Sequence, residues 1–398
     1  MMFKQFTNAV KLAAKGKKIR LDLELKTLAL AQKDIKSWRQ AWQAAINIEN
    51  PKRMQLYSIY QDALIDNHLS GAIEQRKDFV LQKAFKLVDA KGKENLELTQ
   101  ALETGWFKDF LRMSLDSIFW GHSLVEFGDI IDIGGRKTFS YVQLVPRHHV
   151  CPEYGVLLRD SGDDVKNGIS YREDKSINQW VVEAGTPNSL GLLLQVCPQV
   201  ISKRYAMAYW DQWGEAFGAP VRIAKTNTRD EVERSSIFKM LENLGFKSFG
   251  VFPEGTEIEF KETNRSDAYL VYDKRIERAN NEMSKAILGQ TMTLDNGSSK
   301  SQGEVHLQVL QNIINQDADF LKDIINDRLL PFLEMHGFSF KGYTFAWDET
   351  IDLTPEQQKS IEEMLINNYE VDPQYFIDKY NIPVKAKAKE TALKGFFD

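Results

Sequence analysis

Apolar residues recur every three or four positions in several parts of the chain, which is the spacing of helices with one buried face. In the segment 54–78 this spacing is carried by Leu56, Ile59, Tyr60, Ala63 and Leu64. Thr104 and Gly121 are typical of the start and the end of a helix, so we predict another between them. Further helices are predicted at 190–217, 229–244, 266–288, 304–336 and from Thr354 onward.

Between residues 121 and 189 the periodicity changes to short alternating runs, which indicate strands. Residues 124–127 and 138–145 flank Gly134-Gly135, a pair typical of a tight turn, so we predict a hairpin there. Further strands are predicted at 155–159, 178–183, 221–225 and, around a turn at Pro253–Gly255, 248–260. Long helices combined with separate β-rich regions predict an α+β fold.

The helix predicted at residues 304–336 is the longest in the chain. It would span roughly 50 Å, more than the diameter of a small domain, so we expect it to cross between layers or subunits. Pro331 lacks the backbone N–H of a helix interior and should bend this helix. Pro198, in the predicted helix 190–217, should kink that helix or mark its real start. Residues 295–303 are small and polar and form the best loop candidate.

Composition narrows the class of protein. The chain has 398 residues, 43% hydrophobic and 27% charged, which is ordinary globular usage and excludes a collagen-like or fully disordered chain. No apolar run approaches the ~20 residues that cross a bilayer. We expect no secretory signal and no membrane partner, since lysines interrupt the N-terminal region. Only Cys151 and Cys197 occur, which excludes a disulfide scaffold and fits a reducing compartment.

Charge is distributed unevenly along the chain. The net charge of −5 argues against a strongly basic nucleic-acid clamp as a whole-chain property. Residues 1–55, however, hold twelve Lys or Arg against four acids, and the remainder is strongly acidic. A basic arm of this kind predicts contact with nucleic acid or with an acidic partner, while a solvated helix face is an equally good interpretation.

The densest cluster of candidate metal ligands is His148-His149-Val-Cys151-Pro-Glu153. On a strand, His149, Cys151 and Glu153 would share one face, and zinc uses such side chains. A zinc site needs three or four ligands of fixed geometry, and no second cluster accompanies this one. The pattern therefore favours a structural strand end, and we predict no metal.

The acids Asp317, Asp319, Asp323 and Asp327 form a second candidate cluster. The last three recur at four-residue steps and therefore lie on one helix face. A row of carboxylates on a helix is typical of a solvated surface, so we predict no catalytic carboxylate pair here.

Two other patterns have a functional and a plain structural interpretation. Residues 297–303, GSSKSQG, hint at a phosphate loop but lack the GxxxxGK[ST] spacing. Trp210 and Trp213 could stack on bases, although aromatic residues at helical spacing are typical of a core or a subunit contact. Since no GxSxG, HExxH or DxDxDG motif occurs either, we predict that the protein is not an enzyme and uses no cofactor.

The order of four stretches makes the chain resemble portal proteins of tailed phages, specifically the Mu-like family. The stretches are LYSIYQDALIDNHLSGAIEQR (56–76), FLRMSLDSIFWGHSLVE (110–126), YWDQWGEAFGAPVR (209–222) and ILGQTMTL (287–294) followed by GEVHL (303–307). The resemblance covers roughly residues 35–345. It implies a ring, usually of twelve subunits, at one capsid vertex, through which double-stranded DNA is packaged and later ejected.

The resemblance also implies a division of the chain. It implies a basic N-terminal arm at 1–40, a wing at 41–189 and 304–345, stem helices at 190–217 and 266–289, a clip at 218–265, a tunnel loop at 290–303 and a crown at 346–398. The implied fold is the α+β portal fold, with long helices in stem and wing and small β-rich wing and clip subdomains.

Three groups of site residues follow from the same resemblance. The tunnel loop that faces DNA would present Asn296, Gly297, Ser298, Ser299, Lys300 and Gln302. The clip, where the terminase and later the adaptor proteins dock, would use Arg222, Lys225, Arg229 and Glu254. Candidates for the stem channel are Lys274, Arg278 and Lys285. A conduit must not hold DNA tightly, and both stem segments are balanced in charge, as this role requires.

The implied partners are other copies of the chain, double-stranded DNA, the terminase large subunit, and the major capsid and head-completion proteins. The implied location is the portal vertex of the virion, after assembly in the host cytoplasm. Two alternatives remain: a head-assembly adaptor or scaffold that binds proteins only, and a metal-dependent DNA-processing enzyme. An axial opening wide enough for duplex DNA would distinguish a portal from an adaptor, and converging carboxylates would indicate the enzyme.

Overall fold

A computed structural model describes residues 34–217, 222–226, 230–243, 249–253, 268–291, 300–348, 355–369 and 371–380. These residues form both helices and strands, largely in separate runs along the chain, which confirms the α+β class. The chain divides into two compact units, the first ending at Trp347 and the second beginning at Asp348.

The described part of the first unit begins with three helices: α1 (Ile35–Ala45), α2 (Met54–Ala63) and α3 (Asn67–Leu81). The sequence predicted one helix over residues 54–78, and this was wrong. The chain breaks after Leu64 because Asp66 caps a new helix, its carboxylate accepting hydrogen bonds from the N–H groups of His68 and Leu69 at 3.0 and 3.1 Å. The apolar spacing continues through this break and conceals it.

Helix α5 (Gly105–Trp120) has the predicted limits. The N–H of Phe107 donates to the Thr104 hydroxyl at 3.3 Å, and Gly121 ends the helix with φ of +90°. At this end the backbone of residues 189–191 passes so close to Gly121 that a Cβ on Gly121 or Gly191 would overlap with backbone atoms of the other segment. The start of the next long helix is therefore fixed against the end of α5.

The strands among the described residues form five small sheets. Strand β1 (Phe85–Asp89) pairs antiparallel with β12 (Tyr343–Trp347), which joins distant parts of the chain. Between β1 and residue 186 the strands and short helices are α4 (Leu96–Leu102), β2 (His122–Phe127), β3 (Ile130–Ile133), β4 (Arg136–Phe139), β5 (Val142–Leu144), η1 (Arg147–His149), β6 (Val150–Cys151), β7 (Val156–Leu157), η2 (Val165–Asn167), β8 (Ile169–Ser170), α6 (Lys175–Asn178) and β9 (Val181–Gly185).

The predicted hairpin around Gly134-Gly135 is present but built in two parts. Strands β3 and β4 pair next to the glycines, and β2 pairs with β5 farther from them. The central strand β2 also pairs with β9, so the sheet order is β5–β2–β9. Strand β9 begins at Val181 rather than at 178, because residues 175–178 form the short helix α6.

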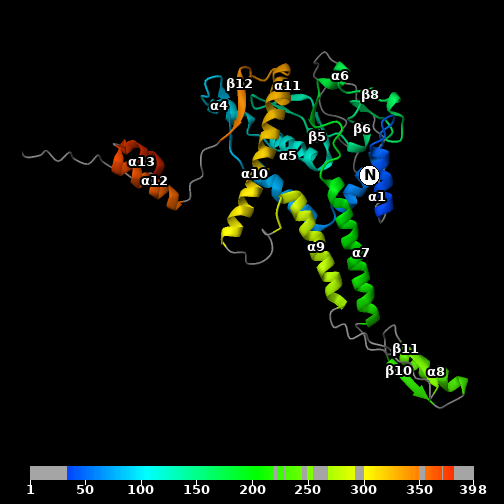
Figure 1. Ribbon diagram of the computed structural model, residues 1–398. Coiled ribbons are helices and arrows are strands. Elements are labelled where there is room, and N and C mark those ends of the chain that lie inside the picture. The colour runs from blue at the N-terminus through cyan, green and yellow to red at the C-terminus, as the bar shows by residue number, and fades with distance from the viewer. Residues whose placement is uncertain are drawn as a thin grey trace, which may run out of the picture. The chain divides into compact units, whose positions relative to one another are not determined.

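Two long helices, α7 (Leu193–Phe217) and α9 (Ala268–Leu288), run side by side (Figure 1). Pro198 lies inside α7, so the expectation that it marks the start of the helix was wrong. Proline has no N–H, so this position cannot donate a helical hydrogen bond to the preceding turn. Lys203 ties α7 to the start of α3 through an ion pair at 2.8 Å with Asp66, the residue that caps α3. Between the two helices the chain forms β10 (Arg222–Thr226), α8 (Glu231–Asn243) and β11 (Phe249–Pro253), and β10 and β11 pair in parallel.

The longest predicted helix is observed as α10 (Lys300–Ile324), a π-helical turn η3 (Ile325–Leu329) and α11 (Leu330–Met335). It starts four residues earlier than predicted, so Lys300 and Gln302 lie in a helix and not in a loop. In η3 the N–H of Leu330 donates to the carbonyl of Ile325, and Pro331 follows with no N–H to continue the α pattern. The irregularity expected at Pro331 therefore occurs in the turn before it.

The core of the first unit is one apolar cluster to which α1, α2, α3, α5, α7, α9, α10 and β12 contribute. Phenylalanine rings fill its centre; Phe127 and Phe332, for example, lie 4.6 Å apart between ring centroids. A second, smaller cluster lies under the short strands and contains Leu124, Val145, Val150, Leu157, Tyr171 and Ile177.

The second unit contains α12 (Pro355–Asn368) and α13 (Pro373–Tyr380). Pro355 stands at the first helical position, as predicted. The Lys379 ammonium lies 2.8 Å from the Glu362 carboxylate and joins the two helices. Within the described residues of both units, no helix is long and apolar enough to cross a membrane.

Candidate functional site

Helix α9 carries a row of cations on the face opposite its packed side. Lys274, Arg278 and Lys285 are all exposed and fall within about 40° of one another around the helix axis. The buried residues of α9, among them Met283 and Ile287, lie on the other side. The stripe extends about 16 Å along the axis, so the helix presents an ordered positive row to whatever lies beside it.

Acidic side chains flank this stripe and moderate its charge. Glu282 approaches Lys285 at 3.2 Å, and Glu277 is exposed on the same half of the helix. Exposed ion pairs of this kind are weak, so the cations stay available to a polyanion at low affinity per contact. On the neighbouring helix α7, Tyr205 and Tyr209 are 38% and 56% exposed, which leaves aromatic surface for contact with another molecule.

A buried ion pair connects three helices near the end of α9. Arg76 of α3 donates from Nε and Nη2 to both oxygens of Asp317 of α10, at 2.6 and 2.8 Å. Its Nη1 donates to the Ile287 carbonyl of α9 at 2.6 Å. Both side chains are under 10% exposed, so removing either one would leave the other charge buried without a counter-charge.

Asp317 therefore differs from the other acids of its series. Asp319, Asp323 and Asp327 are exposed, which confirms the predicted solvated face. Asp317 instead lies on the apolar side of α10, between Ile314 and Leu321 on the helix surface. A helical projection of the sequence could have flagged an acid in that position, although it could not have named Arg76 as its partner.

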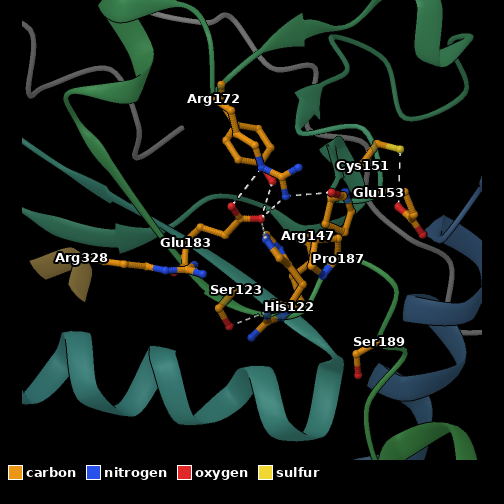
Figure 2. Close-up of polar contacts among 12 residues, drawn as sticks. His122, Ser123, Arg147, Cys151, Glu153, Arg172, Glu183, Pro187, Ser189 and Arg328 are labelled. Carbon is orange, nitrogen blue, oxygen red and sulfur yellow. Dashed lines mark hydrogen bonds and ion pairs between the residues drawn. The ribbon is translucent and has the colours of Figure 1, made fainter. Parts of the chain in front are cut away.

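A second polar network centres on Glu183 of β9 (Figure 2). Its carboxylate accepts hydrogen bonds from His122 Nε2 at 2.8 Å, the Tyr171 hydroxyl at 2.7 Å and Arg172 Nη2 at 2.6 Å. Burial by itself would raise the pKa of Glu183, but the hydrogen bonds from His122 and Arg172 outweigh it and lower this pKa to about 2. Burial also lowers the pKa of His122, so the imidazole is neutral at pH 7.

Two further arginines hold the backbone around this network. Arg147 donates to the His122 carbonyl and, at 2.9 Å, to the Ser123 hydroxyl. Arg53, at the start of α2, donates to Glu153 at 2.7 Å, to the Pro187 carbonyl at 2.6 Å and to the Ser189 carbonyl at 2.9 Å. Arg53 thus fixes the segment that leads from β9 into α7, and Arg147 fixes the start of β2.

The candidate metal cluster does not assemble. His149 belongs to the 3-10 turn η1 and not to a strand, so the predicted shared face was wrong. Its Nδ1 bonds to the Leu158 carbonyl at 2.9 Å, and Glu153 is held by Arg53. In the part of the chain that the structure describes, no group of three or more His, Cys, Asp or Glu side chains could hold a metal ion.

The other predicted site residues are distributed as follows. Arg222 and Lys225 belong to β10, while Arg229 and Glu254 lie outside the described residues. Of the predicted tunnel loop, Lys300 and Gln302 stand in the first turn of α10. Asn296, Gly297, Ser298 and Ser299 lie outside the described residues.

Acid is expected to loosen the Glu183 network. The lowered pKa of Glu183 means that the folded state keeps this carboxylate charged, so its contribution to stability is present above its ordinary value of 4.5 and lost as the pH falls toward about 2. His122 acts in the same direction: its pKa is lowered from 6.5, and protonation below that value favours the unfolded state. Thermal unfolding followed between about pH 7 and pH 3 should show a falling midpoint.

A Glu183→Gln variant provides the control for this titration. It keeps the shape of the side chain but removes the carboxylate, so its midpoint should fall less steeply below about pH 5 than that of the unchanged protein. Identical slopes for the two proteins would show that other acids dominate.

Comparison with known proteins finds a phage portal family model and a solved portal structure. A family model described as the portal protein of Mu bacteriophage matches residues 57–382. Among solved structures, the crystal structure of an HK97-family phage portal protein from Corynebacterium diphtheriae is similar at 13% sequence identity and a TM-score of 0.40. That similarity covers 78% of this chain and 97% of the other. The comparison with curated proteins found no match.

Proposed function

The chain belongs to the family of portal proteins of Mu bacteriophage, and from that premise we propose that it forms a ring at one capsid vertex through which double-stranded DNA enters and leaves. Portal proteins are structural and not enzymatic. The observation that carries the proposal is the family match, which covers residues 57–382. The proposed location is the portal vertex of the virion, after assembly in the host cytoplasm.

A closed ring requires two different surfaces on each subunit that meet head to tail. The exposed tyrosines of α7 offer aromatic surface for one side of such an interface, while the cationic row of α9 stays free for the channel. We therefore propose α7 and α9 as the stem, and the ring as a homo-oligomer of twelve copies.

The remaining roles extend the proposal along the chain. We propose residues 41–189 and 304–345 as the wing, 218–265 as the clip that contacts terminase and head-completion proteins, and 346–398 as the crown. We propose 290–303 as the segment that faces DNA, and in it Lys300 and Gln302 belong to the first turn of α10. In the clip, Arg222, Lys225, Arg229 and Glu254 are the proposed contacts, and the capsid protein would surround the wing. These assignments rest on the family and on the order of the elements.

The proposal is tested first by the size and shape of the purified protein. A ring of twelve 45.7-kDa chains would weigh about 550 kDa, and light scattering should find this mass. Negative-stain images of the same fraction should show rings with a central opening. A closed dimer with two-fold symmetry would contradict the proposal, and rings without an opening would contradict the passage of DNA.

The cationic row of α9 should govern weak contact with DNA. In a ring, changing Lys274, Arg278 and Lys285 together to Gln should reduce the salt dependence of duplex binding, by about 0.9 in the slope of log K against log salt for each phosphate that is no longer neutralised. Filter binding at several salt concentrations measures this slope.

The matched control removes three exposed lysines elsewhere, Lys91, Lys93 and Lys341, by the same change to Gln. It alters the net charge equally but leaves α9 intact. An equal reduction of the slope in both variants would show that only the net charge acts, and would contradict a channel role for α9.

A further inference from the structure

A pocket of about 330 Å³ lies between strand β9 and the helical segment formed by η3 and α11. Its walls contain Val181, Val182 and Glu183 from β9, and Arg328, Phe332 and Met335 from the helical side. Two side chains hold the elements together at either end: Arg328 Nη1 donates to the Glu183 carbonyl at 2.5 Å (Figure 2), and His336 Nε2 contacts the Gln179 carbonyl at 2.6 Å. The pocket lies between these two contacts.

Strand β9 is at the edge of its sheet, since the order of strands is β5–β2–β9. The N–H of Phe127 donates to the Trp180 carbonyl, so by the antiparallel alternation Trp180, Val182 and Ala184 direct their backbone groups toward β2. Val181 and Glu183 therefore direct theirs away from β2, toward the pocket. The hydrogen bond from Arg328 to the Glu183 carbonyl agrees with this direction.

The charge of the pocket is not balanced. Arg172 is paired with Glu183, whereas Arg328 is exposed and makes no ion pair with any described residue. Beside it, Pro331, Phe332 and Met335 form an apolar wall, and Met335 is 58% exposed. A carboxylate is the natural partner for the guanidinium, and an apolar side chain for the wall.

The spacing of these two features matches an extended chain. Arg328 and Phe332 are one helical turn apart, about 6 Å along the axis. In a strand, side chains two positions apart lie on one side and are separated by roughly 6.6 Å. An extended segment could therefore place an acidic side chain at Arg328 and an apolar one at Phe332 while its backbone lies along β9.

We propose that this pocket binds an extended segment of a partner protein, with an acidic residue two positions from an apolar residue, by hydrogen bonds to the free edge of β9. On binding, Arg328 transfers from the Glu183 carbonyl to the carboxylate of the segment, and a backbone N–H of the segment takes its place. In the absence of a partner, Arg328 covers the edge, as charged side chains do on edge strands of many proteins. The inference concerns the wing surface alone and does not depend on ring formation.

The test uses fluorescein-labelled peptides of the pattern Gly-Thr-X-Thr-Glu-Thr-Gly and its reverse, with Val, Leu or Phe at X, and fluorescence anisotropy on the full chain. At least one peptide should bind with a dissociation constant below about 1 mM. Replacing its Glu with Gln, or changing Arg328 to Gln in the protein, should weaken binding about tenfold. Changing Lys322 to Gln removes the same charge from the preceding part of the helix and should leave the affinity unchanged.

A second measurement does not depend on a protein variant. N-methylation of alternate peptide amides removes the N–H groups on one edge of the peptide, so one methylated set should lose binding and the other should retain it. Equal loss in both sets would overturn strand pairing. Equal affinity of the Arg328→Gln variant, or failure of every acidic peptide to bind, would overturn the proposal.

Discussion

Changing Asp317 to Ala is expected to lower the free energy of unfolding by about 3–5 kcal/mol, since it leaves the buried Arg76 guanidinium without its counter-charge. Arg76 would still donate to the Ile287 carbonyl, which anchors one side of the group but supplies no negative charge. Urea unfolding followed by tryptophan fluorescence measures the change. Asp319→Ala is the matched control: Asp319 lies on the same helix and pairs with Lys322 at 2.7 Å at the surface, where removal costs about 0–1 kcal/mol.

A double variant separates the loss of the pair from the exposure of one charge. Arg76→Met together with Asp317→Leu removes both charges and keeps apolar volume, so it should cost less than Asp317→Ala alone. If Asp317→Ala proves no more harmful than Asp319→Ala, then water must reach Arg76, and the pair does not hold α3, α9 and α10 together.

Gly191→Ala is expected to destabilise the first unit by about 2–5 kcal/mol, from left-handed backbone strain and from overlap of the new methyl group with its neighbours. Gly191 has φ of +72°, and its Cβ would meet the carbonyl group of Phe119. The loop before α7 would have to move away from the end of α5, and α7 would move with it. Chemical unfolding measures the loss of stability.

Gly92→Ala is the control that isolates the strain. Gly92 has φ of +78°, but a Cβ at this position would have no atom within 4 Å, so the substitution should cost about 1–2 kcal/mol from the backbone alone. A larger loss at Gly191 than at Gly92 measures the close approach of the two segments. Equal losses of stability in the two variants would mean that the loop before α7 moves to make room for the methyl group at no cost in free energy.

Local signals predicted local structure. The limits of α5 could be taken from Thr104 and Gly121, because a cap and a terminating glycine act within a few residues of each end. The break before α3 was missed because apolar spacing alone ignores a cap; Asp66 followed by Asn67 was the signal that could have located it. The early start of α10 was missed because Gly303 and its polar neighbours are typical of loops, although Lys and Gln also favour helices.

Contacts between distant segments could not be predicted in the same way. Arg76 and Asp317 are 241 positions apart, and nothing local to either names the other. The Glu183 network likewise collects side chains from β2, β9 and the turn after β8. The family, by contrast, was predictable, since it depends on the order of several short stretches and not on any one contact, and the match over residues 57–382 confirms it.

The pairing of β1 with β12 sets an order of events during synthesis. Phe85 faces Trp347 in this sheet, so the first unit cannot close until the ribosome has released β12. By then α7 and α9 have already been synthesised, but the sheet that completes the first unit has not yet formed. Pairing between strands so far apart in sequence generally slows folding. The pairing of β1 with β12 also tolerates a longer chain between the two strands. Doubling the length of that chain would add only about 0.6 kcal/mol to the entropic cost of bringing the strands together. The segment between α7 and α9 can therefore lengthen during evolution while the sheet that closes the unit stays the same.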